Sequence, residues 1–359
     1  MNLSRRDFVK SATLAAAGIA TASAPFTAKA AVRKRGIKLG LDNFSVRAMG
    51  WKAPRLIEYA AELKTDSLFI TDLVAFEKFS DDYCADLRKK ATDADLQIHL
   101  GSWSICPTSK SFKKDWGTAE EHLALGIRMA KALGSPVFRV VLGAQDDRKT
   151  EGGIEARIAD TVKVLQSQKS KAVDAGVKIA VENHAGDMQA WEVVSLVEAA
   201  GKDYVGVNAD SGNALWTMED PLRSLEILAP YVITTSLRDS AVWESENGAT
   251  VQWTAMGEGT IDTVAYFDKF EKLCPGVPVH IETISGFNRE LAYLKPDFMA
   301  LFPKAKASDL ARFIAVAKKG KSRPTHRSAN NTEEQEYQRG EIERSIKNAK
   351  ELLGLGLKA

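Results

Sequence analysis

Residues 178–187 read KIAVENHAGD, an apolar run that leads directly into Glu182, Asn183, His184 and Asp187. Apolar residues that follow one another without alternation are typical of a strand buried on both faces. A buried carboxylate costs free energy unless a cation or hydrogen-bond donors neutralise it. The stretch therefore predicts a buried strand whose carboxyl end carries charge that some partner must compensate.

The same pattern recurs from residue 37 onward, where short apolar runs alternate with longer segments of helical period. This alternation is typical of parallel strands covered by helices. Eight candidate strands occupy residues 37–43, 67–73, 96–103, 137–143, 177–184, 204–210, 231–239 and 277–283. Eight strand-helix units of this total length suit an α/β fold of the (β/α)8 TIM barrel type, whose usual size is roughly 250 residues. The alternative, a doubly wound open sheet, is disfavoured because no Gly-rich turn follows the first strand.

The barrel is predicted to occupy residues 31–303, and residues 304–359 are predicted to form a C-terminal helical extension. Within the barrel, Thr118 and Glu121 form a capping box and Gly134 a helix stop. The extension contains two amphipathic helical segments joined by the polar linker 322–331. We expect these helices to pack on the barrel or on another subunit, and a solvated helical tail is the alternative.

Residues 1–30 have the order of features of a twin-arginine signal peptide. Arg5 and Arg6 precede an apolar, Ala-rich run, and residues 28–30 form a small-x-small cleavage pattern. We therefore expect export by the twin-arginine machinery to the periplasm; the alternative is a cytoplasmic protein with an amphipathic start. No later apolar run approaches the roughly 18 residues that a membrane span needs.

The charge balance argues against a nucleic-acid partner. The whole chain has a net charge of +2, and residues 1–30 carry four basic residues and one acidic residue, a net +3, so that about −1 remains for the mature chain. A nucleic-acid binder is expected to carry a basic surplus. The three cysteines, Cys84, Cys106 and Cys274, show no CxxC spacing that would indicate a redox pair or a zinc site.

Acidic and polar residues stand at the ends of the last four candidate strands: Glu182, Asp210, Ser236 with Asp239, and Glu282. The carboxyl ends of barrel strands meet at one mouth, so these residues are predicted to lie close together. Three carboxylates in a partly desolvated cleft repel one another unless a cation neutralises them. Hard divalent ions such as Mg²⁺ and Mn²⁺ prefer oxygen ligands of this kind.

Four segments resemble the sugar phosphate isomerase/epimerase family with the xylose-isomerase-like barrel. They read VKIAVENHAGD (177–187), VGVNADSGN (205–213), SLRDS (236–240) followed by MGEGTID (256–262), and VHIETISG (279–286). The resemblance extends over about residues 37–300. It implies that Glu182, Asp210 and Glu282 bind one divalent metal, with Mn or Mg preferred and Co or Zn as alternatives. Ser236 stands where the family has a histidine ligand, which leaves metal affinity and activity open.

The resemblance also implies roles in catalysis and substrate binding. Glu182 and Glu282 would stand on opposite sides of the reacting carbon, one removing a proton and the other returning it. His184 would contact substrate hydroxyls or replace the missing imidazole, and Asn213 is placed for a hydroxyl. Independently of the resemblance, Asp239 could bind a hydroxyl or orient Arg238, and Trp103, near a loop at the barrel mouth, could form an apolar wall against a sugar ring. Each of these residues also has a structural alternative. His184 could be a hydrogen-bonded structural histidine, and Asn213 could simply tolerate an unusual backbone angle. Asp239 could belong to an internal ion pair, and Trp103 could be part of the core.

These features favour a metal-dependent isomerase or epimerase that acts on a carbohydrate or keto-sugar derivative by enediolate proton transfer. A lyase that acts on an oxidised glycoside through the same enolate is one alternative. A non-catalytic exported carbohydrate-binding protein is the other. The sequence leaves open whether the chain forms a homo-oligomer.

Overall fold

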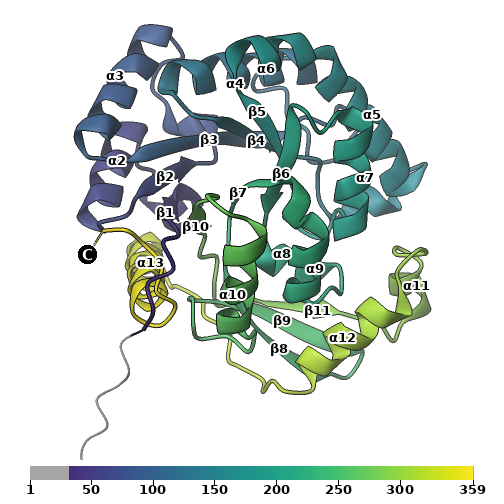
Figure 1. Cartoon of the computed structure of the whole chain (residues 1–359). Helices are drawn as coiled ribbons and strands as arrows, with labels where there is room; N and C mark the ends of the chain where they lie inside the picture. The colour runs from purple at the N-terminus through teal and green to yellow at the C-terminus, as the bar shows by residue number, and fades with distance from the viewer. Residues whose placement is uncertain (1–31, 359) are drawn as a thin grey trace, which may run out of the picture. The chain divides into compact units, whose positions relative to one another are not determined.

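The computed structural model describes residues 32–358, so the predicted signal peptide lies outside the described residues. Eight parallel strands form the main sheet in the order β10-β1-β2-β3-β4-β5-β6-β7 (Figure 1). They are β1 (Leu39–Asp42), β2 (Ser67–Ile70), β3 (Gln97–Ser104), β4 (Val137–Val141), β5 (Lys178–Glu182), β6 (Val205–Ala209), β7 (Val232–Thr235) and β10 (Val279–Ile281). Each lies within one of the predicted strand segments apart from the last residue of β3, and the predicted TIM barrel is confirmed.

The barrel closes between the chain that follows β7 and strand β10. The backbone N–H of Leu237 donates to the carbonyl of His280 over 2.7 Å, and the N–H of Glu282 donates to the carbonyl of Leu237 over 2.9 Å. Leu237 and Ile281 form an isolated parallel bridge. The closure therefore brings the segment 236–239 against the strand end that carries Glu282.

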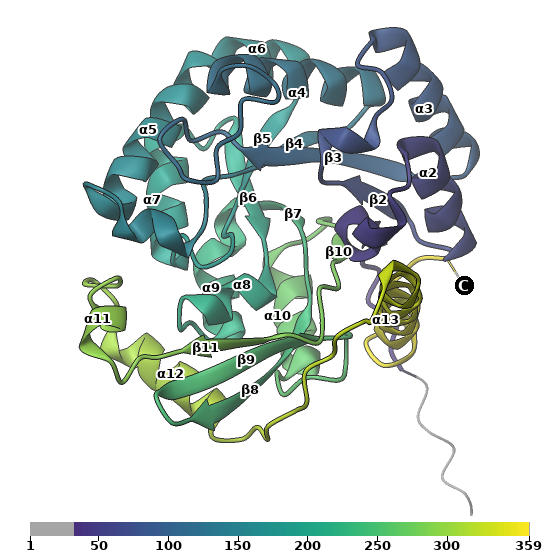
Figure 2. The same cartoon turned by 180° about the vertical axis from the view of Figure 1, so that it is seen from behind.

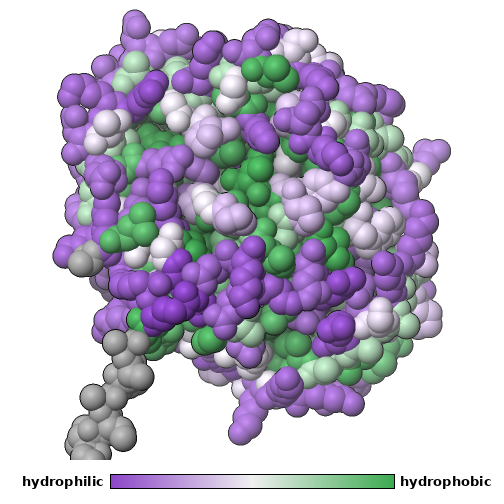
Figure 3. Space-filling model, in the orientation of Figure 1, coloured by the Kyte–Doolittle hydropathy of each residue, from purple (hydrophilic) through white to green (hydrophobic). Residues whose placement is uncertain are grey.

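Helices surround the strands. They are α2 (Ala53–Glu62), α3 (Asp81–Asp93), α4 (Ala119–Leu133), α5 (Gly153–Ser167), α6 (Lys169–Ala175), α7 (Ala190–Ala200), α8 (Ser211–Trp216), α9 (Pro221–Leu228) and α10 (Thr263–Leu273), with short 3₁₀ segments η1 (Asn43–Met49), η2 (Leu73–Ala75), η3 (Gln145–Lys149) and η4 (Ala229–Tyr231). The predicted capping box of Thr118 and Glu121 begins α4, and Gly134 ends it in the left-handed conformation. Hydrophilic residues cover much of the periphery of the face in Figure 3, and hydrophobic residues show between them toward the middle.

A second, antiparallel sheet was not predicted. Its strands are β8 (Asp239–Ser245), β9 (Gly248–Thr254) and β11 (Asn288–Leu291), in the order β11-β9-β8. The predicted strand 231–239 is therefore too long, because β7 ends at Thr235 and the chain turns into β8 at Asp239. Figure 2 shows this sheet beside α8 and α12, and its side chains form a second apolar core with residues such as Trp216 and Phe313.

The C-terminal helices cover these two parts of the protein. Helix α12 (Ala307–Ala317) follows the short α11 (Pro296–Met299) and packs on the second sheet. Helix α13 (Asn331–Glu351) contacts β1, β10 and η1, and so covers the side of the barrel where β10 lies next to β1 (Figure 2). Gln338 accepts a hydrogen bond from the N–H of Ala48, and Ser345 accepts one from the N–H of Met256. The expectation that these helices pack on the barrel holds for α13, whereas α12 packs on the second sheet, which was not predicted.

Two further expectations concern membranes and cysteines. No helix within residues 32–358 combines the length and the apolar character that crossing a bilayer requires. Cys84, Cys106 and Cys274 are all buried free thiols.

Glu219 is buried between α8 and α9, and the pH dependence of the free energy of unfolding can test this burial. Burial raises the pKa of Glu219 to about 8, although hydrogen bonds from the N–H of Ala190 and the hydroxyl of Thr217 oppose the shift. The native state therefore keeps a proton between pH 5 and 8 that an unfolded Glu has released, and the free energy of unfolding falls as pH rises through this range.

We expect Glu219→Gln to remove this contribution. Urea denaturation from pH 5 to pH 8 should show the variant gaining stability relative to the wild type as pH rises. Glu62→Gln changes a carboxylate on the exposed side of α2 and should show a constant difference over the same range. Parallel curves for Glu219→Gln and the wild type would contradict the assignment.

Candidate active site

A cavity of about 250 Å³ lies at the carboxyl ends of the barrel strands. Its walls are largely aromatic and its floor is charged; the lining residues are Phe44, Thr71, Asp72, Trp103, Arg139, Glu182, His184, Ala185, Asn213, Trp216, Arg238, Trp253, Glu282 and Ile284. Ligand pockets for drug-sized molecules usually measure roughly 300–1,000 Å³. The cavity therefore suits a smaller, polar molecule with an apolar face.

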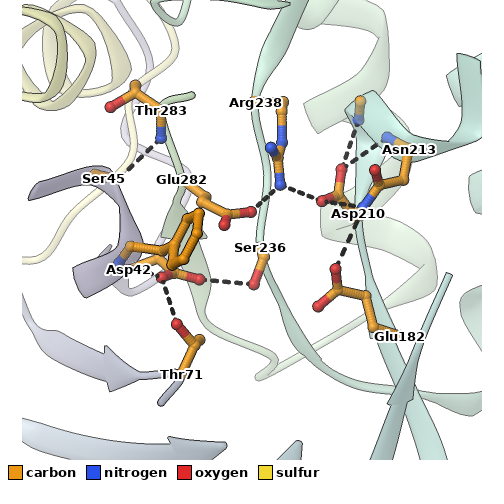
Figure 4. A network of polar contacts seen from close by, with 12 residues as sticks. Asp42, Ser45, Thr71, Glu182, Asp210, Asn213, Ser236, Arg238, Glu282 and Thr283 are labelled. Atoms are coloured by element: carbon orange, nitrogen blue, oxygen red, sulfur yellow. Dashed lines mark hydrogen bonds and ion pairs between the residues drawn. The ribbon is translucent and has the colours of Figure 1, made fainter. Parts of the chain in front are cut away.

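Arg238 occupies the centre of the charged floor. Its Nη2 donates to Oδ2 of Asp210 and to Oε2 of Glu282, so the guanidinium bridges the two carboxylates (Figure 4). The Arg238 side chain is 2% exposed. Its Nε and Nη1 atoms are buried and have no hydrogen-bond partner among the described residues. Two N–H-bearing atoms of this guanidinium thus lack an acceptor among residues 32–358.

Glu182 is held by a second buried arginine. Its Oε2 accepts from Nε of Arg139 over 2.6 Å and from Nδ2 of Asn208 over 2.6 Å, and its Oε1 accepts from Nδ2 of Asn213 over 3.2 Å. Burial is the largest influence on the pKa of Glu182 and raises it, but the charge and hydrogen bond of Arg139, together with further positive charge such as that of Arg238, lower the pKa below its ordinary value. The partner of the carboxylate in KIAVENHAGD is therefore Arg139 of β4.

Asp210 is the N-cap residue of helix α8, and protein groups donate hydrogen bonds to both of its carboxylate oxygens. Its Oδ1 accepts from the backbone N–H groups of Gly212 and Asn213 over 2.8 and 2.9 Å, as an N-cap does. Its Oδ2 accepts from the side chains of Asn213 and Arg238. Burial raises the pKa of Asp210 to about 6, although Arg238 opposes the shift.

Ser236 takes part in a hydrogen-bond chain with Asp42. Its hydroxyl donates to Oδ2 of Asp42 over 2.8 Å and accepts from Nδ2 of Asn208 over 3.2 Å. Asp42 also accepts from the N–H of Phe44 and the hydroxyl of Thr71. Burial raises the pKa of Asp42 to about 6, and the hydrogen bonds from the Phe44 N–H and the Ser236 hydroxyl oppose the shift. At the position where the sequence resemblance expects a histidine ligand, the hydroxyl thus donates a hydrogen bond to a neighbouring carboxylate.

An aromatic stack supports Arg238 from the second sheet. The guanidinium carbon lies 4.1 Å from the ring centroid of Trp253 on β9, and Trp253 stacks on Trp216 of α8 at 4.3 Å and 7°. Arg289 of β11 covers the other side of Trp216 at 4.2 Å. Two cations and two indole rings thus form one column, an arrangement favoured by cation–π attraction.

His184, Trp103 and Asn213 line the cavity, as the sequence predicts. Nδ1 of His184 lies 2.6 Å from the carbonyl of Gly143, which can only accept, so this nitrogen carries the proton and Nε2 is left as an acceptor. Burial lowers the pKa of His184 and favours the neutral ring. Trp103 donates its indole N–H to the carbonyl of Ser111 and meets His184 edge to face at 5.2 Å.

Asp239 lies outside the cavity lining and contacts backbone instead. Its carboxylate accepts from the N–H groups of Ser240, Gly257 and Gly259. The predicted role in substrate binding is therefore not supported by its position. Asp239 is the first residue of β8, and its hydrogen bonds connect this strand to the turn that contains Gly257 and Gly259. The three amide donors satisfy the buried carboxylate.

The predicted metal ligands do not fit a divalent ion as they lie. Glu182 and Glu282 both face the cavity, but the bridging atom between Asp210 and Glu282 is Nη2 of Arg238. Within residues 32–358, no group of three or more His, Cys, Asp or Glu side chains is arranged to hold a metal ion. Mn²⁺ or Mg²⁺ at this point would have to displace a buried guanidinium.

Sequence reasoning missed Arg139, Asp42, Asn208 and Trp253 as parts of the site. Arg139 left the clearest signal, because a single arginine within the apolar run VFRVVLG (137–143) must pair with an acidic group. Asp42 and Asn208 also lie in strand segments that the sequence predicted, and both are fully buried. Trp253 could not be assigned without the second sheet.

Comparisons with known proteins agree with this architecture. A relative, 3-oxo-isoapionate decarboxylase from Pectobacterium atrosepticum, is 22% identical over 209 residues, 58% of this chain and 68% of the relative. The structure of a D-tagatose 3-epimerase-like protein has a TM-score of 0.54 at 16% identity and covers 78% of this chain and 98% of that chain. A D-psicose 3-epimerase structure in the presence of D-fructose has a TM-score of 0.53 at 16% identity, with 78% and 97% covered.

A structure of the IOLI protein with a bound zinc atom has a TM-score of 0.52 at 16% identity and covers 80% of this chain and 100% of that chain. At these identities the solved structures show a shared fold alone. The model of the xylose isomerase-like TIM barrel family matches residues 57–300, well over half of the sequence. The chain described here therefore belongs to the xylose isomerase-like TIM barrel family.

Proposed function

We propose that this protein is a sugar isomerase or epimerase that moves a proton next to the carbonyl of a monosaccharide-sized keto-sugar. The observation that carries the proposal is that two glutamates, Glu182 and Glu282, face one small cavity with the donor Arg238 on its floor. The aromatic walls suit the apolar face of a sugar ring, and the polar floor suits its hydroxyls. Sugar epimerases among the structurally similar proteins support the same class.

The two glutamates differ in their freedom to carry a proton. Glu182 accepts three hydrogen bonds from N–H donors, all of which favour the carboxylate. Glu282 has Arg238 as its one side-chain partner among the described residues, through Oε2 only. We therefore assign Glu282 as the group that removes the proton from the carbon next to the carbonyl, leaving its electron pair in an enediolate.

Other side chains would complete the reaction. Return of the proton by Glu282 to the former carbonyl carbon, with transfer of the neighbouring hydroxyl proton to the former carbonyl oxygen, gives an isomer. Return to the opposite face of the same carbon gives an epimer and requires Glu182 or a hydroxyl on that side to act as the acid. His184, with Nε2 as an acceptor, is placed to orient a substrate hydroxyl.

Solvent deuterium incorporation tests this function. The purified protein is incubated in D₂O with a panel of ketohexoses, ketopentoses and 3-keto-glucosides, and proton NMR follows loss of the signal next to the carbonyl. We expect one substrate class to gain deuterium and to be converted into an isomer or epimer. Absence of exchange in every substrate, with binding of a sugar detected by calorimetry, would favour the non-catalytic binding role instead.

A decarboxylase or lyase is the second candidate, and two observations favour it. A relative is a 3-oxo-isoapionate decarboxylase, and the cavity floor contains two arginines that could hold a substrate carboxylate. Both reactions pass through an enolate, so the same donor would serve them. Release of CO₂ from a 3-oxo acid, or of free aglycone from a 3-keto-glycoside, distinguishes this candidate from an isomerase in the same NMR assay.

We also propose that the protein is exported through the twin-arginine pathway. The proposal rests on Arg5, Arg6 and the apolar and small residues that follow them in residues 1–30. In a bacterial host, we expect the mature protein in the periplasmic fraction and its retention in the cytoplasm when Arg5 and Arg6 are both replaced by Lys. Equal cytoplasmic amounts of both proteins would contradict export.

A further inference from the structure

The side chain of Arg238 occupies the position between Asp210 and Glu282 that a divalent metal would need. Nη2 of Arg238 bridges Asp210 and Glu282, and the guanidinium carbon lies 4.1 Å from the ring centroid of Trp253. A Cβ atom on Gly212 would lie 2.5 Å from Cγ and Cδ of Arg238, so only glycine leaves room for this side chain. The Arg238 side chain therefore packs closely between Gly212 of α8 and Trp253 of the second sheet.

The backbone of Arg238 is fixed as well. Its carbonyl accepts from the hydroxyl of Ser211 over 2.6 Å, and its N–H donates to the same hydroxyl over 3.1 Å. Swinging the guanidinium away would leave Asp210 without its cation and would uncover Trp253. Displacement of Arg238 by a metal would thus cost a buried ion pair and a cation–π contact.

The remaining acidic groups of the site are satisfied without a metal. Glu182 pairs with Arg139, and Asp42 accepts from Ser236, Thr71 and the N–H of Phe44. The Ser236 hydroxyl, at the position of the expected histidine ligand, is already engaged on both sides. A divalent cation would find no carboxylate here that lacks a donor.

We propose that the guanidinium of Arg238 is the built-in cation of this site, and that the site does not take up a divalent metal. Its Nε and Nη1, buried and without partners, then donate hydrogen bonds to the carbonyl oxygen of the substrate and to the enediolate oxygen that forms from it. This second step rests on the proposed function, whereas the exclusion of metal does not. Preorganised donors of this kind stabilise a developing oxyanion.

Metal binding is tested on the full-length mature protein with Mn²⁺ and Zn²⁺ as probes. After incubation with 1 mM MnCl₂ or ZnCl₂ (about 1 mM suffices for a micromolar site) and gel filtration, elemental analysis should find less than about a tenth of an equivalent per chain. The melting temperature should change by less than about 1 °C. About one equivalent per chain, lost on treatment with EDTA, would overturn the proposal.

The variant Arg238→Met should create a metal site, because it removes the guanidinium and leaves Asp210 and Glu282 facing one another. We expect 1 mM MnCl₂ to raise its melting temperature by roughly 5 °C, with further gain in Ser236→His/Arg238→Met. Arg148→Met is the matched control: Arg148 is equally buried and pairs with Glu192, but lies outside the cavity. If Arg148→Met or the wild type responds to Mn²⁺ as strongly as Arg238→Met, the proposal is wrong.

The donor role has a separate readout in the deuterium-exchange assay. Arg238→Lys keeps a positive charge but loses the planar fork, and we expect exchange to fall by roughly 10²-fold or more with a smaller change in KM. Guanidinium ion added to Arg238→Ala should restore part of the lost rate, and added MnCl₂ should not restore the Lys variant. Wild-type exchange that disappears in EDTA would overturn the donor role, whereas a metal-free protein without exchange on any substrate would contradict the proposed function alone.

Discussion

Replacement of Glu282 by Gln is expected to lower the rate of solvent deuterium incorporation by roughly 10³-fold, within the range usual for a lost general base. Glu282 lines the cavity and is bound by Arg238 through Oε2 only, so its Oε1 has no side-chain donor among the described residues and is the oxygen assigned to accept the proton. Gln keeps the shape and one acceptor but cannot take up a proton. NMR-monitored exchange at saturating substrate measures the effect on the chemical step.

Glu290→Gln makes the same chemical change on the exposed strand β11 and should exchange at the wild-type rate. Substrate affinity of Glu282→Gln, measured by calorimetry, should stay within a few-fold of the wild type. Exchange by Glu282→Gln at more than about a tenth of the wild-type rate would remove Glu282 from the chemistry.

Replacement of Arg139 by Met is expected to have the largest effect on stability, a loss of about 3–5 kcal/mol in the free energy of unfolding. Arg139 and Glu182 have side chains 6% and 1% exposed, so the variant leaves a buried carboxylate without its cation. Arg139 also donates from Nη1 to the carbonyl of Ser102, and this contact is lost as well. Urea denaturation at pH 7 measures the change.

Two further variants separate the charge effect from lost packing. Arg139→Met/Glu182→Gln removes both charges and should recover a large part of the loss, because the pair is coupled. Arg128→Met breaks an exposed pair with Asp81 and should cost no more than about 1 kcal/mol. A loss below about 1 kcal/mol for Arg139→Met would show that Glu182 does not depend on this arginine.

The barrel strands could be predicted from the sequence because burial on both faces leaves an unmistakable apolar pattern. The run VKIAVENH (177–184) contains β5 with both ends within about two residues of the observed ones. The hairpin of β8 and β9 was missed although its signal was present. The Asn-Gly dipeptide at residues 247–248 favours tight hairpin turns, and alternating apolar residues follow it at positions 249, 251 and 253; the observed turn lies one residue earlier, at residues 246–247, with Ser245 paired to Gly248.

The identity of the acidic residues in the site could also be predicted, but their partners could not. Glu182, Asp210 and Glu282 stand at strand ends that any TIM barrel brings to one mouth. Whether a metal or an arginine neutralises them depends on the path of the Arg238 side chain, which in turn depends on Gly212 and on Trp253 of the unpredicted sheet. Strand periodicity carries no information on such a contact.

The most direct test of the account is a crystal of the mature protein soaked in MnCl₂ and measured at the manganese absorption edge. We predict no anomalous peak between Asp210 and Glu282, with the guanidinium of Arg238 in density between the two carboxylates as in Figure 4. An anomalous peak bound by Glu182, Asp210 and Glu282, with Arg238 turned out of the cavity, would contradict it.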